Sequence, residues 1–88
     1  MVIGMEKKPI GKITHFFSNI GVAVVVLENE IKKGDKIEIG GKSEPFQQIV
    51  ESMQIEKETI ETASAGQAVG LKVNQPVMKG DIVYKITE

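Results

Sequence analysis

The sequence of 88 residues contains no cysteine, no arginine and no tryptophan. Without cysteine the chain can form no disulfide, no thiolate metal site and no cysteine nucleophile. Without arginine it lacks the planar guanidinium that makes bidentate contacts to phosphate or guanine. With a single histidine, His15, it cannot assemble the nitrogen and sulfur ligands typical of zinc. We therefore expect no metal, no cofactor and no enzymatic activity.

The chain also lacks a strong charge of either sign. Eleven lysines stand against twelve acidic residues, for a net charge of −1, which argues against a strongly basic nucleic-acid module. Enrichment in lysine and glutamate without cysteine is typical of thermophile proteins. No apolar run approaches the length of a membrane span, and residues 1–9 lack the apolar segment of a signal peptide. We expect a cytoplasmic protein with no membrane partner.

Short β-branched segments separated by turn residues are what the chain does contain. Val22–Leu27 is apolar on both of its faces, which predicts a central strand covered on both sides. Alternating or apolar patterns predict further strands at Ile10–Phe17, Lys36–Ile39, Gln67–Val73 and Asp81–Ile86. The segments between them are polar and are expected to be connections, among them Glu28–Lys33 and Glu56–Thr62, where a short bridge at Ile60 stays open.

Phe46–Ile55 is ambiguous. Its apolar residues change face partway along, which predicts one strand with a bulge or a bend at a barrel corner. Phe46, Ile49, Val50 and Met53 also fit helical spacing, so a helix stays open here. With turns about every 8–12 residues, the pattern predicts an all-β protein. We expect a polar lead-in at 1–9 and one domain at 10–88, a small closed Greek-key β-barrel of six or seven strands.

Two predicted turns contain the same three residues, Lys-Gly-Asp. Lys33-Gly34-Asp35 and Lys79-Gly80-Asp81 each stand two residues after an apolar residue, Ile31 or Val77, and lead into a predicted strand. Glycine can take a positive φ in a turn, and aspartate can accept hydrogen bonds from nearby backbone N–H groups. We interpret them as two similar turns that launch strands, rather than as a ligand site.

Six segments, Ile10–Ile13 (IGKI) and Gly21–Val24 (GVAV) among them, together resemble domain two of the translational GTPases, the β-barrel of elongation factor Tu. Ile31–Ile39 (IKKGDKIEI), Ala63–Leu71 (ASAGQAVGL) and Val77–Val83 (VMKGDIV) look like its turn-and-strand motifs, and Val50–Met53 (VESM) looks like one of its strands. The chain has no phosphate-binding loop, so no GTPase activity carries over. Gly11–Phe17 (GKITHFF) is similar to a strand in the C-terminal barrel of collagenase-like peptidases.

Seven residues are the candidates for contact with a partner. In strict alternation one of Phe16 and Phe17 must face outward, where it could stack on a base or anchor a protein, unless a loop covers it. His15 would share a face with Ile13 and Phe17, and we expect a packed or rim histidine rather than a catalytic one. The lysine cluster could touch phosphate or form a mixed-charge solvated face, and the glutamines could offer amides or form an exposed edge. The candidates are Phe16, Phe17, Lys32, Lys33, Lys36, Gln47 and Gln48.

The first resemblance implies a non-catalytic, translation elongation factor-like module. It would contact tRNA, ribosomal RNA or a separate protein subunit that carries the catalytic domain. One alternative is an accessory barrel that acts in trans with a collagenase-like peptidase or an RNA-modifying enzyme. Another is a structural module that forms oligomers through an exposed edge or its aromatic pair.

Overall fold

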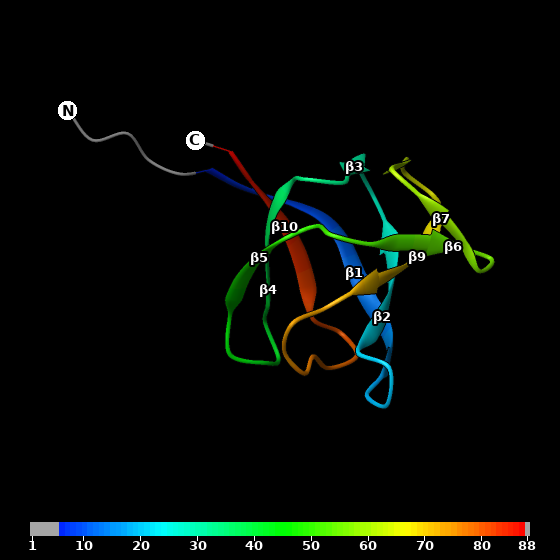
Figure 1. The fold of residues 1–88 in the computed structure, drawn as a ribbon. Helices are drawn as coiled ribbons and strands as arrows, with labels where there is room; N and C mark the ends of the chain where they lie inside the picture. The colour runs from blue at the N-terminus through cyan, green and yellow to red at the C-terminus, as the bar shows by residue number, and fades with distance from the viewer. Residues whose placement is uncertain (1–5, 88) are drawn as a thin grey trace.

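The computed structural model describes residues 6–87, and within them the chain is built from strands and turns (Figure 1). The main sheet has eight antiparallel strands in the order β5-β4-β10-β1-β2-β9-β6-β7, and β3 pairs separately with β8. The all-β class is therefore confirmed. The strands are β1 (Glu6–Phe17), β2 (Val22–Leu27), β3 (Ile31–Lys32), β4 (Lys36–Gly40), β5 (Phe46–Ile49), β6 (Met53–Ile55), β7 (Glu58–Ile60), β8 (Thr62–Ala63), β9 (Ala68–Lys72) and β10 (Ile82–Thr87).

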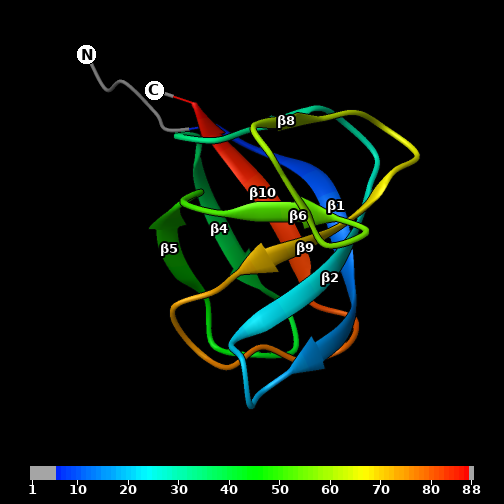
Figure 2. The ribbon, with the colours of Figure 1, turned by 45° about the vertical axis from the view of Figure 1, so that its right-hand side comes forward.

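The sheet curls into a half-barrel and does not close (Figure 2). Strands β5 and β7 are its two ends, and no ladder joins them in the described part of the chain. The prediction of a closed barrel is therefore wrong. The segment expected to be one long strand, Phe46–Ile55, is divided into β5 and β6, and β6 pairs with β9 instead of extending along β4. The helical alternative for this segment is also wrong.

The strand count exceeds the predicted six or seven because β3, β7 and β8 lie in segments that were expected to be connections. These strands have only two or three residues each, so they leave no periodic pattern in the sequence. Strands β3 and β8 are held by pairing between distant segments, Ile31 with Ala63, whereas β7 forms a tight local hairpin with β6, in which Ile55 pairs with Glu58. Only the folded chain brings such partners together.

Strand β1 begins at Glu6, before the predicted start at Ile10, because Glu6–Pro9 pair with β10. The predicted lead-in at 1–9 thus lies partly outside the described residues and partly in β1. Further along, the register of β1 against β2 shifts between Ile13 and His15, which is a β-bulge at Thr14.

The bulge at Thr14 decides which way the end of β1 faces. Ile13 opposes Val25 on the inner side, whereas His15 opposes Val24 on the outer side. The expectation that His15 shares a face with Ile13 is therefore wrong, because the extra residue reverses the alternation. Phe16 packs against the core, and Phe17 is 46% exposed.

The core lies inside the curl of the sheet. Its largest fully buried side chains come from β1, β2, β3, β4, β6, β9 and β10 and from Val50 after β5, and they are Ile10, Ile13, Val25, Leu27, Ile31, Ile37, Ile39, Val50, Met53, Val69, Leu71 and Val83. Strand β2 contributes Ala23, Val25 and Leu27 to this side, but Val26 on its other side is 40% exposed. The prediction that both faces of Val22–Leu27 are covered is wrong, since one layer of sheet covers only one face.

Candidate functional site

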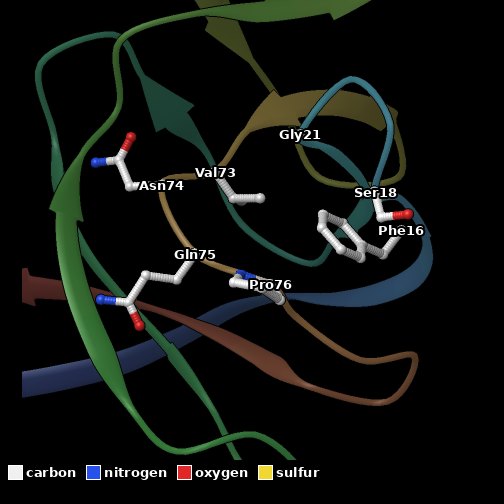
Figure 3. A pocket seen from close by; sticks show the side chains of 7 residues that line it. All are labelled: Phe16, Ser18, Gly21, Val73, Asn74, Gln75 and Pro76. Carbon is white, nitrogen blue, oxygen red and sulfur yellow. The ribbon is translucent and has the colours of Figure 1, made fainter.

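A shallow pocket of about 170 Å³ opens at one rim of the half-barrel. It lies between the β1–β2 turn and the segment that follows β9. Figure 3 shows Phe16, Val73 and Pro76 close together, with Asn74 and Gln75 extending on the other side. The lining residues are Phe16, Ser18, Gly21, Val73, Asn74, Gln75 and Pro76.

Backbone hydrogen bonds hold both walls of this pocket. In the β1–β2 turn the N–H of Gly21 donates to the carbonyl of Phe17 at 2.9 Å, with a φ of 66° that suits glycine. The N–H of Val73 then donates to the carbonyl of Gly21, also at 2.9 Å. This bond ties the turn to the end of β9, so the pocket wall is part of the rigid sheet.

The amide of Gln48 fastens the same rim to strand β5. Its Nε2 donates to the carbonyl of Lys72 at 2.8 Å, and its Oε1 accepts from the N–H of Asn74 at 2.8 Å. One side chain thus spans the gap between β5 and the end of β9, where no backbone ladder forms in the described residues. Gln48 is buried, so its amide serves the fold. Its neighbour Gln47 is exposed and donates to Glu38.

The predicted site residues do not gather in one place. Figure 1 shows β3, the strand that contains Lys32, at the end of the molecule opposite the β1–β2 turn, which follows Phe16 and Phe17. The Lys32 ammonium lies 3.6 Å from the Glu30 carboxylate. Lys33 and Lys36 flank the Asp35 turn beside it. A contact with phosphate at these lysines stays a prediction, and of the seven candidates only Phe16 lines the pocket.

Sequence reasoning missed the residues of the other pocket wall. Asn74, Gln75 and Pro76 lie between the predicted strands Gln67–Val73 and Asp81–Ile86, where the sequence predicts only a connection. Proline in a polar stretch signals a turn but not what the turn will face. The pocket depends on the contact between this loop and the β1–β2 turn, and that contact joins segments far apart in the sequence.

The two aspartates cap turns, which confirms the interpretation of the repeated letters. Asp81 is fully buried, and its carboxylate accepts from the N–H groups of Lys42, Ser43 and Met78 at 2.7, 2.8 and 2.9 Å. Burial by itself raises the pKa of Asp81, but these backbone donors, together with the side chain of Ser43, outweigh it and hold the pKa below its ordinary value. The Asp35 carboxylate accepts from the N–H of Lys32.

His15 faces solvent beside an aromatic ring. Its imidazole stacks on Phe17 with ring centroids 6.3 Å apart and planes 10° apart, and its Nδ1 lies 3.4 Å from the Thr14 hydroxyl. No group of three potential metal ligands occurs within residues 6–87. No helix in that same range is long and apolar enough to cross a bilayer. The arrangement offers surfaces for binding through apolar and amide contacts.

Comparison with known proteins shows which family the chain resembles. A family model for the peptidase family U32 C-terminal domain matches residues 6–83. An uncharacterized protease of Methanocaldococcus jannaschii is 39% identical over 84 residues, which is 94% of this chain and 21% of that protein. A collagenase of Porphyromonas gingivalis is 34% identical over 82 residues, 91% of this chain and 23% of that protein. The chain thus spans about a fifth of the length of these relatives.

Comparison with a solved structure gives the same family. The crystal structure of the C-terminal domain of a putative U32 peptidase from Geobacillus thermoleovorans superposes with a TM-score of 0.83 at 26% identity. The match covers 89% of this chain and 91% of that one. The agreement therefore extends over nearly the whole fold.

These findings overturn the resemblance to elongation factor Tu and the translation role drawn from it. The motifs behind that resemblance are mainly turn chemistry: Gly34, Gly66 and Gly80 all adopt positive φ, and the aspartates cap turns. Any small curled sheet with tight corners needs such residues, so they do not distinguish one family from another. The second resemblance, carried by Gly11–Phe17, pointed to the correct family. The chain belongs to the family of peptidase U32 C-terminal domains.

Proposed function

We propose that this chain is a non-catalytic accessory module that works with the catalytic part of a U32 peptidase, on the same polypeptide or in trans. The observation that carries the proposal is the extent of the match. The relatives named protease and collagenase align with nearly all of this chain but are about five times as long. Their catalytic machinery is then expected in the remaining four-fifths, outside the part that this chain resembles.

The chemistry of the described residues supports a binding role. A nucleophile needs a general base within hydrogen-bonding reach, and a triad needs an acid behind the base. His15 stands beside Phe17 and Thr14, and Asp81 uses both carboxylate oxygens on backbone N–H groups. In keeping with the absence of cysteine, the proposal places the module in the cytoplasm.

The rim pocket indicates what the module would hold. Pockets for small molecules usually have volumes of about 300–1,000 Å³. This one has about 170 Å³, which suits a single side chain of a larger ligand. Its apolar wall of Phe16, Val73 and Pro76 could receive that side chain, while the exposed amides of Asn74 and Gln75 could bond to the main chain beside it. We therefore expect an extended polypeptide as the ligand.

Binding of gelatin peptides to the purified chain tests this function. A tryptophan at the exposed residue Ser18 would fill the pocket, whereas a tryptophan at Ser64, in an exposed turn outside the pocket lining, would not. We expect measurable binding by surface plasmon resonance and at least a 10-fold loss in S18W, with S64W like the original chain. Absence of binding, or equal effects of the two substitutions, would contradict the role of the pocket.

A further inference from the structure

A second apolar surface lies on the opposite side of the sheet from the core. Val22, Val24 and Val26 point outward from β2, and Phe17 and Ile20 continue the surface around the β1–β2 turn. Phe17, Ile20 and Val26 are 46%, 54% and 40% exposed. We call these five residues the outer face. Three of the five large apolar side chains that are exposed in the described chain belong to it.

The neighbouring strand keeps the outer face open. On β9, Ala68, Gly70 and Lys72 pair with Val26, Val24 and Val22, respectively. Two of these three neighbours of the valines are therefore small residues. A Cβ on Gly70 would come within 3.3 Å of Val22 Cγ1. The absence of a side chain there leaves room for an approaching partner above Val22 and Val24. A surface that is both apolar and accessible over adjacent strands is typical of an interaction site.

Positive charge surrounds the outer face. Lys12 opposes Val26 from β1, and the Lys72 ammonium reaches the carbonyl of Ile20 at 3.2 Å. His15 lies between Lys12 and Phe17, and no acidic residue occurs in residues 11–27 or in β9. Two copies of this chain placed face to face would bring these lysines together, which disfavours a homodimer through this surface. A partner with carboxylates around an apolar patch would be complementary.

We infer that the outer face docks against the catalytic part of the U32 peptidase, at an apolar patch bordered by carboxylates. The inference rests on the proposed function. In the Methanocaldococcus relative about four-fifths of the protein lies outside the match, and the matched family is a C-terminal domain. In such a protein, the polypeptide that precedes the matched domain therefore continues directly into the N-terminal end of β1. That strand begins at Glu6 and reaches Lys12, which pairs with Val26 at the near end of the outer face, so the partner is tethered to the strand that borders this face and enters from the end opposite Phe17.

The test compares the chain alone with a chimera in which it replaces the matching region of the intact Methanocaldococcus protease. Valine methyl groups labelled for NMR serve as reporters in both. Val22, Val24 and Val26 point outward, whereas Val25, Val69 and Val83 are buried and act as internal controls. We expect the three outward valines to change chemical shift in the chimera and to lose contact with a soluble paramagnetic probe, and the buried ones to keep their positions.

Two substitutions and their matched controls sharpen the test. In the chimera, V24K should move the signals of Val22 and Val26 to the positions that they have in the V24K variant of the chain alone, and should restore their contact with the paramagnetic probe. I49K places the same charge at an exposed apolar residue on β5, away from the outer face, and should leave them unchanged. The contribution of the positive charge beside the outer face is tested by comparing Lys12→Glu with Lys79→Glu. The first should raise the fraction of undocked domain at least 3-fold, and the second should have no effect.

The outcomes separate this inference from the proposed function. If gelatin shifts the Val73 signal at the rim pocket but the outward valines keep their free positions, the docking surface is wrong and the accessory role stands. If the outward valines of the chain alone shift with its own concentration, a second copy is the partner and the inference is overturned. If neither gelatin nor the chimera changes any valine signal, both proposals fail.

Discussion

The inner and outer sides of the β1–β2 hairpin are made of similar residues and have different surroundings. Inside, Ile13, Ala23 and Val25 are fully buried. Outside, Val26 and Phe17 are 40% and 46% exposed on the same two strands. A strand that is apolar on both faces needs a packing layer on each face, and this fold packs only its inner face against other strands. The difference teaches that excess hydrophobicity in a small domain can indicate a surface for a partner rather than a deeper core.

The chain offers matched pairs for testing this difference, and the neighbouring phenylalanines should show the largest effect. Phe16 packs against the core and Phe17 does not. We expect Phe16→Ala to lower the free energy of unfolding by about 3 kcal/mol and Phe17→Ala by less than about 1 kcal/mol. Chemical denaturation measures both. Equal losses would show that the bulge at Thr14 is misplaced.

The neighbouring glutamines come next. Replacing Gln48 with leucine leaves the carbonyl of Lys72 and the N–H of Asn74 without their partner. A buried unpaired polar group costs about 1–3 kcal/mol, so we expect a loss of about 2–3 kcal/mol. Gln47→Leu, at the exposed neighbour, should change stability by less than about 0.5 kcal/mol. Hydrogen exchange of the Asn74 amide should rise in the first variant and stay unchanged in the second.

The two aspartates should differ by a smaller amount. Asp81→Asn puts an amide donor against backbone N–H groups and should cost about 2 kcal/mol, whereas Asp35→Asn loses one backbone bond and a contact to Lys85 and should cost about 1 kcal/mol. Thermal unfolding at neutral pH compares them. If Asp35→Asn proved the more damaging substitution, burial would not explain the difference.

The buried Asp81 predicts a dependence of stability on pH. The pKa of Asp81 is lower in the folded chain than its ordinary value, so the folded state binds fewer protons than the unfolded state near that value. The stabilisation is therefore complete above about pH 4 and is lost as the pH falls through the folded pKa. Asp81→Asn should flatten the fall in stability at acid pH. If the fall in stability at acid pH were the same in this variant, carboxylates other than Asp81 would be responsible for it.

An ion pair on the outer side of the sheet should show the smallest effect. The Lys7 ammonium donates to Glu38 at 2.8 Å, and this hydrogen bond lowers the pKa of the Glu38 carboxyl. Lys7→Gln should raise that pKa toward its ordinary value in an NMR titration. Because exposed ion pairs contribute little, the melting temperature should hardly move. A large drop in melting temperature would mean that the outer side contributes more to folding than its exposure suggests.

Much of the strand pattern could be predicted from local residues. Val22–Leu27 was placed with its observed bounds, and Lys36–Ile39 nearly so, because β-branched runs and glycine turns act over a few residues. Both Gly-Asp corners were interpreted correctly for the same reason. The rim pocket could not be predicted, since its walls are Ser18–Gly21 and Val73–Pro76, and nothing local signals that they meet.

The sequence by itself determined the all-β class, the turns and which residues are apolar enough to be buried. Only the tertiary structure decided that the sheet stays open, that Phe16 rather than Phe17 turns inward, and that Gln48 rather than Gln47 is buried. The physical reason is the period of two in a strand. One bulged residue in β1, or one break between β5 and β6, reverses every side chain beyond it, and such irregularities are set by long-range pairing.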